Sequence, residues 1–175
     1  LHAQFEIIHP FWDGNGRVGR MFMPLFLYSK EVLSSPMLYL SAYFEKNRTK
    51  YYDELLTVSA KRDWHDWILF FLEAVMEQAK ESTRQARAIH DLYKEKKEEI
   101  TEVTGSKYTL DVLDFLFCSP IFSSTILIER TRLNRPSAGR ILRRLLENKV
   151  IECIEEPRGR RPGHYVFPEL LKITG

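Results

Sequence analysis

Apolar residues recur at a spacing of three to four along most of the chain, and this periodicity predicts a mainly helical protein. Leu1, Phe5 and Ile8 form one apolar stripe, so the chain opens within a helix. The same pattern predicts further helices over 15–33, 37–59 and 64–79. Residues 81–102 keep only a thin apolar stripe within a charged run, which indicates a partly solvated helical connector that ends before Gly105.

Two of these helices carry more specific signals. The stretch 15–33 is apolar nearly all round, as expected of a helix in the centre of a bundle. Pro24 lies inside this stretch and predicts a kink, because its nitrogen cannot donate to the carbonyl of Arg20. Asp63 is expected to cap the helix that follows it.

The last third of the chain has a different pattern. Short apolar helices are predicted over 110–117, 124–131 and 138–148. Alternating strands are predicted over 150–155 and 164–167, with a basic Gly/Pro-rich loop between them. This order is typical of a small α+β winged helix-turn-helix domain. We therefore expect three parts: a helical core over 1–80, a connector over 81–104 and a winged helix over 105–175.

Composition and charge narrow the class of protein. The 175 residues are 44% hydrophobic and 13% aromatic, which is typical of a globular chain with a sizeable core. The net charge of the chain is +2. Residues 105–175 contain 12 Lys/Arg and 8 Asp/Glu, a net charge of +4, whereas the rest contains 14 and 16, a net charge of −2. The opposite signs suggest two modules with different partners. No apolar run is as long as a membrane span, so we expect a soluble, cytoplasmic protein. The chain has no initiator Met, and we expect it to be part of a longer protein.

The candidate catalytic and phosphate-binding residues are concentrated in the segment His9-Pro-Phe-Trp-Asp-Gly-Asn-Gly-Arg17. Gly14 and Gly16 lie where a helix begins, so unpaired N–H groups there can form an anion cradle. Arg17 and Arg20 share one helix face and can converge on the same phosphates. The parts of a phosphoryl-type transfer site are therefore present together.

Two further groups in this segment complete the set. The carboxylate of Asp13 suits Mg²⁺ that bridges phosphates. The imidazole of His9 can accept a proton at neutral pH, as a general base must. Taken singly, each residue has a simpler interpretation: a capping or core histidine, an Asp-Gly turn, a Gly-Asn-Gly turn. Phe11 is expected to be only a buried anchor of the loop. The combination favours a transfer site.

The stretch from His9 to Arg20 resembles the signature of Fic-domain proteins: His, any, Phe, any, acidic, Gly-Asn-Gly-Arg, two more, Arg. The runs 39–56 and 63–67 are similar to the C-terminal half of that fold, so the resemblance covers roughly 1–79. It implies a Fic-type helical bundle and transfer of AMP from Mg-ATP to Ser, Thr or Tyr hydroxyls of a target protein. It also implies roles within the loop: His9 as base, Asp13 as Mg²⁺ ligand, Gly14, Asn15 and Gly16 as the anion hole, and Arg17 and Arg20 on the distal phosphates.

Other features of the family are less evident here. Tyr43, Asn47 and Tyr51 share one helix face and are candidates for the nucleotide pocket, although core packing is an equal alternative for the two tyrosines. Fic proteins place a β-hairpin flap, and in many cases an inhibitory helix, before the motif. Neither pattern occurs in these 175 residues. We therefore expect target docking to be incomplete, and we expect exposed apolar faces to favour homo-oligomers.

Basic residues in the last third support a second hypothesis. Arg135, Ser137, Arg140, Arg143 and Arg144 lie on the third predicted helix of this region, and Arg158, Arg160 and Arg161 lie in the predicted wing. A DNA-binding helix-turn-helix places such residues on phosphates and base edges. The alternatives are a protein-binding module or a solvated face, since the charge excess is small. In this hypothesis the protein is a winged-helix regulator and its Fic half is a scaffold.

Overall fold

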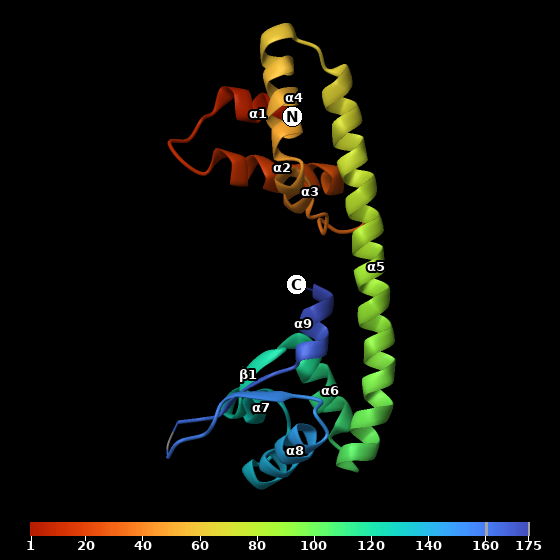
Figure 1. Cartoon of the computed structure of the whole chain (residues 1–175), viewed down its shortest axis with the longest axis vertical. Coiled ribbons are helices and arrows are strands. Elements are labelled where there is room, and N and C mark those ends of the chain that lie inside the picture. Colours follow the sequence, from red (N-terminus) through yellow and green to blue (C-terminus); the bar gives the residue numbers. More distant parts are fainter. Residues whose placement is uncertain (160, 175) are drawn as a thin grey trace. The chain divides into compact units, whose positions relative to one another are not determined.

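The computed structural model describes residues 1–159 and 161–174 (Figure 1). The chain folds as two compact units, Leu1–Arg84 and Gln85–Gly175. The described part is mainly helical with a small three-stranded sheet, which confirms the predicted class. One helix, α5 (His65–Thr104), begins in the first unit and ends in the second.

The first unit is entirely helical within its described residues. Its elements are α1 (His2–Ile8), α2 (Asn15–Ser29), α3 (Leu40–Lys46), α4 (Arg48–Lys61) and the first part of α5. Its core is built from the apolar stripes of these helices: Ala3, Met23, Leu38, Leu40, Phe44, Tyr51, Val58, Trp67, Phe70 and Ala74. This packing positions the loop between α1 and α2.

Two predictions for this unit were wrong in detail. The single helix expected over 37–59 is broken at Asn47, whose side chain donates to the Tyr43 carbonyl at 2.9 Å. An Asn side chain that bonds nearby backbone in this way competes with helical continuation. The segment 15–33 is also not a central helix, because the apolar side chains of Phe22, Leu25 and Phe26 on α2 are exposed.

The helix α5 spans two segments that were predicted as separate elements. It contains 40 residues, so the helix predicted over 64–79 and the connector predicted over 81–102 are one continuous element. The Asp63 carboxylate accepts the backbone N–H of His65 at 3.0 Å, as expected for a residue at the start of this helix. At the other end, Gly105 takes a positive φ of 53° that favours glycine after a helix.

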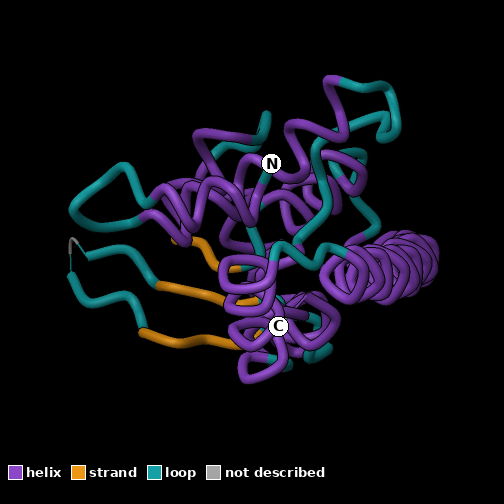
Figure 2. The backbone as a smooth tube through the Cα atoms, turned by 90° about the horizontal axis from the view of Figure 1, so that it is seen from above, coloured by secondary structure: helices purple, strands orange, loops and turns teal. Residues whose placement is uncertain are grey.

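The second unit combines short helices with an antiparallel sheet. After the end of α5 its elements are α6 (Thr109–Cys118), β1 (Ile121–Ser123), α7 (Ser124–Arg130), α8 (Arg135–Glu147), β2 (Glu152–Glu155), β3 (His164–Val166) and α9 (Pro168–Thr174). The strand order is β1-β3-β2, with Tyr165 paired with Phe122 on one side and Cys153 on the other. Figure 2 shows the three strands side by side. Eighteen buried residues form a separate core here, from Leu92 to Leu170.

Two elements of this unit were not predicted. The strand β1 has three residues and depends on pairing with β3, a long-range contact that a local pattern cannot reveal. The helix α9 is joined to α5 by an ion pair of 2.7 Å between Glu169 and Lys96.

The helix α8 begins at Arg135, three residues before the predicted start, and Asn134 caps it by accepting the Ser137 N–H at 2.9 Å.

None of the helices in the described residues has the length and apolar character needed to cross a bilayer.

Candidate active site

The loop between α1 and α2 begins at His9. This residue ends α1 in the left-handed region, with φ 50° and ψ 57°, and its backbone N–H donates to the Phe5 carbonyl at 3.0 Å. A non-glycine residue in this region is uncommon and turns the chain sharply out of the helix. The His9 side chain is exposed, and no residue that the structure describes hydrogen bonds to its imidazole. It is therefore accessible to a reacting hydroxyl.

The side chain of Asn15 fixes the conformation of the loop. Its Oδ1 accepts the N–H of Phe11 at 2.9 Å and its Nδ2 donates to the Phe11 carbonyl at 2.6 Å. Asn15 is buried, whereas the Phe11 ring is half exposed, so the prediction that Phe11 is a buried anchor was wrong. The backbone of Phe11 is held, and its ring is not. Of the groups on Asn15, its backbone N–H remains available to an anion.

The start of α2 presents open backbone donors. Gly14 precedes the helix with a φ of +83°, which favours glycine, and its carbonyl accepts the Val18 N–H at 3.0 Å. The N–H groups of Asn15, Gly16 and Arg17 come before the first bonded turn, and no acceptor for them occurs in the described part of the chain. Such donors at a helix N-terminus attract anions.

Asp13 and Arg17 form an ion pair across this helix start. Asp13 Oδ2 lies 3.3 Å from Arg17 Nη2, and the two side chains are 93% and 74% exposed. The other carboxylate oxygen accepts the Gly14 N–H at 2.6 Å. Exposed pairs contribute only about 0–1 kcal/mol, so a metal ion and a phosphate can displace this one at small cost.

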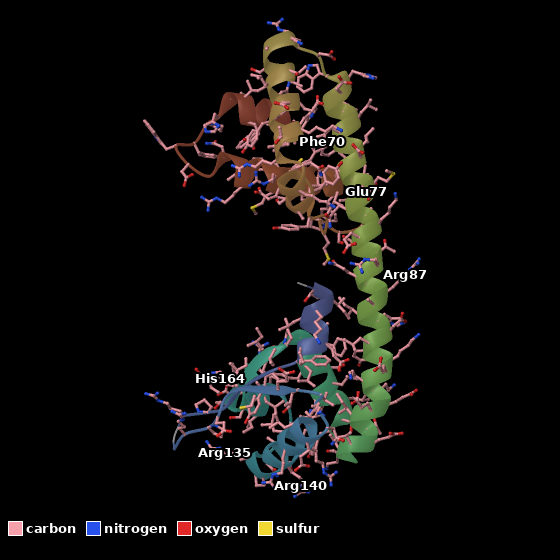
Figure 3. The ribbon with its side chains drawn as sticks, viewed as in Figure 1. Phe70, Glu77, Arg87, Arg135, Arg140 and His164 are labelled. Atoms are coloured by element: carbon pink, nitrogen blue, oxygen red, sulfur yellow. The ribbon has the colours of Figure 1, made fainter. Side chains whose placement is uncertain are left out.

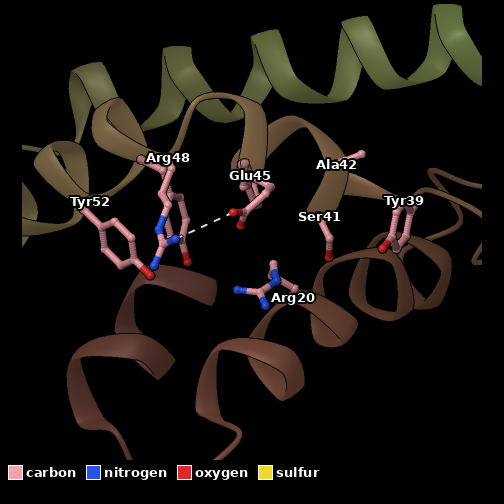
Figure 4. A pocket seen from close by; sticks show the side chains of 9 residues that line it. Arg20, Tyr39, Ser41, Ala42, Glu45, Arg48 and Tyr52 are labelled. Atoms are coloured by element: carbon pink, nitrogen blue, oxygen red, sulfur yellow. Dashed lines mark ion pairs between the residues drawn. The ribbon is translucent and has the colours of Figure 1, made fainter.

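Arg20 faces a pocket that α3 and α4 enclose (Figure 4). The pocket is lined also by Tyr39, Ser41, Glu45, Arg48 and Tyr52, with an ion pair of 3.7 Å between Arg48 and Glu45. Of the two arginines predicted to converge on phosphates, Arg20 lines this pocket, while Arg17 pairs with Asp13. The polar residues Ser41, Glu45, Arg48 and Tyr52 were not singled out from the sequence, although their helical spacing is a polar stripe.

The three predicted pocket residues have different positions. Tyr51 lines the pocket, but it is buried and packs between Phe44 and Trp67. Tyr43 packs against Phe70, and Asn47 bonds to the Tyr43 carbonyl, so neither of these two lines the pocket. Tyr43 is therefore a packing residue, which was the alternative interpretation. Tyr51 is mainly a packing residue too, although part of it reaches the pocket.

His2 supports this region and was not identified from the sequence. Its ring is buried, stacks near Phe44 and Trp67, and places Nε2 2.9 Å from the hydroxyl of Tyr51. Burial lowers the pKa of His2 from 6.5 to about 4, so the ring is neutral at pH 7. Burial also raises the pKa of the Tyr51 hydroxyl. The neutral ring thus connects α1 to α4 and α5.

Close packing of α1 on α2 depends on a glycine. A Cβ at Gly19 would clash with Glu6 Oε1 and would lie 3.0 Å from both His2 Nδ1 and Phe5 Cδ1. Burial raises the pKa of the Glu6 carboxyl, and the opposing charge of Arg20 limits this effect. The site is therefore built on a tight contact that fixes where α2 starts.

The loop carries groups of the kind that hold a magnesium-bound nucleotide. No cluster of three or more His, Cys, Asp or Glu suited to a metal ion occurs among the described residues. Mg²⁺ is commonly held by one or two carboxylates together with substrate phosphates and water. Asp13 can supply the carboxylate, and the amides of residues 15–17 with Arg17 can hold the phosphates.

The predicted DNA-contact residues lie in the second unit. Arg135 and Arg140 project from α8 into solvent (Figure 3), and Arg143 is exposed on the same helix. Arg144 is also exposed but donates to the carbonyls of Thr104 and Val103 at 2.7 and 3.2 Å. Arg158 and Arg161 are exposed in the loop between β2 and β3, whereas Arg160 lies outside the described residues.

A left-handed helix end, a carboxylate, open amides and two arginines together define a loop suited to phosphate-group transfer. The model of the Fic/DOC family matches residues 1–27. The match covers α1, the whole loop and α2 as far as Leu27.

Proposed function

We propose that the protein transfers AMP from Mg-ATP to a hydroxyl of a target protein. The observation that carries the proposal is the segment from His9 to Arg20, which brings an accessible imidazole at the end of α1 together in one short loop with the Asp13 carboxylate and three open amides at the start of α2. The family match over residues 1–27 supports it. Arg20 extends the cationic surface from the loop to the pocket, where the exposed rings of Tyr39 and Tyr52 can stack with a base.

In this mechanism the chain's residues position charge and move one proton. His9 takes the proton of the attacking hydroxyl as its oxygen bonds to the α-phosphorus. The bond from that phosphorus to the bridging oxygen breaks, and pyrophosphate leaves with both electrons of the bond. Mg²⁺, when bound with ATP, neutralises the developing charge. The amides of residues 15–17 and the guanidinium of Arg17 hold the phosphates in line.

The test uses ATP labelled at the α-phosphate, with a cell lysate as the source of targets. We expect wild-type protein to label a protein band, and His9→Ala to reduce labelling by about 10²–10⁴-fold. The matched control is His90→Ala, because His90 is exposed on α5 in the second unit. Equal labelling by wild type and His9→Ala would contradict the proposal. If the protein band is labelled by γ-labelled ATP and not by α-labelled ATP, the group transferred is phosphate instead of AMP.

We also propose a second function, in which residues 105–175 act as a winged helix that binds DNA. The order α6-β1-α7-α8-β2-β3 and the sheet order β1-β3-β2 support it. The specific observation is that Arg135, Arg140 and Arg143 are exposed on one helix and have no ion-pair partner within 1–159 and 161–174. Unpaired arginines on such a helix can meet backbone phosphates.

Salt-dependent binding to a labelled duplex tests this second function. Affinity is expected to fall steeply with added salt, since each phosphate contact releases counterions. Arg143→Ala should weaken binding, and Asp13→Ala, in the other unit, should leave it unchanged. If wild-type protein has no measurable affinity at low salt, the DNA function is rejected.

A further inference from the structure

A polar hollow lies beside α8, where α5 ends and α6 begins. Its wall includes Gly105, Ser106, Lys107, Ser137, Arg140 and Arg144. Three of these side chains are cationic, and none of the residues that line the hollow is acidic. Ser137, Arg140 and Arg144 belong to the predicted DNA surface, whereas Ser106 and Lys107, on the opposite wall, do not.

Hydrogen-bond donors in this wall lack acceptors. In the segment between α5 and α6, the N–H groups of Ser106 and Lys107 have no acceptor among the described residues. The Ser106 hydroxyl already accepts the Tyr108 N–H at 3.2 Å, which fixes this turn. Two open amides beside three cations form a site for an oxyanion rather than for a neutral ligand.

Two carbonyls and one carboxylate near the hollow are neutralised or directed elsewhere. The last carbonyls of α5 would repel an anion, but Arg144 Nη1 donates to those of Val103 and Thr104. Asp111, in the first turn of α6, lines a separate hollow with Arg132. The local field therefore favours an anion, and Lys107, Arg140 and Arg144 have no ion-pair partner in the described residues.

We propose that this hollow binds a backbone phosphate of duplex DNA, an inference that rests on the DNA-binding function proposed for residues 105–175. Arg140 belongs both to the exposed face of α8 and to the wall of the hollow, so a duplex against α8 would bring a phosphate to it. Arg140 and Lys107 contribute charge, and the Ser106 and Lys107 amides contribute directed hydrogen bonds. The contact sets the register of α8 on the duplex and carries no sequence preference.

The experiment compares Lys107→Ala with Lys97→Ala in the full chain. Lys97 is exposed on α5 and does not line the hollow, so the two variants lose the same charge. Affinity for a fluorescent duplex is measured over a series of KCl concentrations. Lys107→Ala should reduce the slope of log affinity against log salt by about 0.9, the value for one phosphate contact. Lys97→Ala should keep the wild-type slope.

A second readout distinguishes a duplex from a small ligand. Inorganic phosphate is added while the amide signals of Ser106 and Lys107 are followed by NMR. The proposal expects shifts that saturating duplex suppresses and that Lys107→Ala weakens. If these shifts persist in saturating duplex, the hollow takes a small phosphorylated ligand and the proposal is overturned.

Failure of the two ideas has different signatures. Equal salt slopes for wild type and Lys107→Ala, with the duplex still bound, overturn the phosphate site and leave the DNA function standing. Absence of duplex binding by wild type at low salt overturns the DNA function, and this proposal with it. Circular dichroism of both variants confirms that they are folded.

Discussion

The side chain of Asn15 holds both backbone polar groups of Phe11, with hydrogen bonds of 2.9 and 2.6 Å. Because Asn15 is buried, the two bonds are partly shielded from water, and they fix the turn that carries Asp13. The conformation of the loop is thus held by the first residue of α2, whose side chain the sequence analysis considered only as part of the anion hole.

Replacement of Asn15 by Ala should therefore destabilise the first unit. Loss of these two partly buried hydrogen bonds is expected to cost about 1–3 kcal/mol in the free energy of unfolding. Urea denaturation followed by tryptophan fluorescence reports this unit, because Trp12, Trp64 and Trp67 all lie in it. The matched control is Ser29→Ala, in the same unit, which removes one exposed bond of 2.8 Å to the Phe26 carbonyl. An unchanged midpoint for Asn15→Ala would contradict the proposed clamp.

His2 should make the stability of the first unit depend on pH. Its folded pKa of about 4 lies below the unfolded value of 6.5, so the unfolded state binds more protons between these values. Stability from neutral His2 is complete above pH 6.5 and is lost as pH falls, by about 2 kcal/mol between pH 8 and pH 5.

A difference measurement isolates this effect from Glu6, whose raised pKa acts in the opposite direction. Wild type and His2→Gln are unfolded in urea at several pH values. The stability advantage of wild type should shrink as pH decreases. Parallel curves for the two proteins would show that His2 is not the titrating group.

Replacement by Ala should lower stability at Gly19 and raise it at Gly139. Gly19→Ala places a methyl group against Glu6, His2 and Phe5, and such overpacking is expected to cost about 1–3 kcal/mol. At Gly139, on α8, nothing lies within 4 Å of the added carbon. Gly139→Ala should stabilise α8 by up to about 1 kcal/mol. Thermal melts of both variants check the pair, and similar effects would refute the packing argument.

Lys96 should determine whether α9 stays docked. It is buried and lies 2.7 Å from Glu99 and from Glu169 of α9. Burial lowers the pKa of Lys96, but hydrogen bonds to Glu169 and Glu99 outweigh this effect and raise it.

Lys96→Ala leaves both carboxylates without their partner, at a cost of about 1–3 kcal/mol, which is below that of a fully buried pair because both carboxylates are about one-third exposed. Hydrogen exchange of the α9 amides should increase in this variant. The control, Lys97→Ala, removes an exposed charge and should leave exchange unchanged. Slow exchange in both variants would mean that apolar packing alone holds α9.

Local signals in the sequence were sufficient for the helical class and for the start of α2. Gly14 and Gly16 predict a helix start after a turn, and the chain has one there. Helix formation and helix starts depend on the conformational preferences of the residues themselves and of neighbours within a few positions, so a local pattern can predict them. The break at Asn47 was not anticipated, because the apolar stripe continues across it and the competing bond to Tyr43 depends on a side-chain conformation.

Long-range contacts decided the rest. His2 lies next to Tyr51, 49 positions away, and its burial changes its pKa, which no local pattern shows. The pairing of β1 with β3 likewise joins segments that are distant in sequence. The sequence by itself determined which chemical groups the loop carries. The tertiary structure determined which of them are buried, paired or open, because desolvation and packing depend on every segment that surrounds a residue.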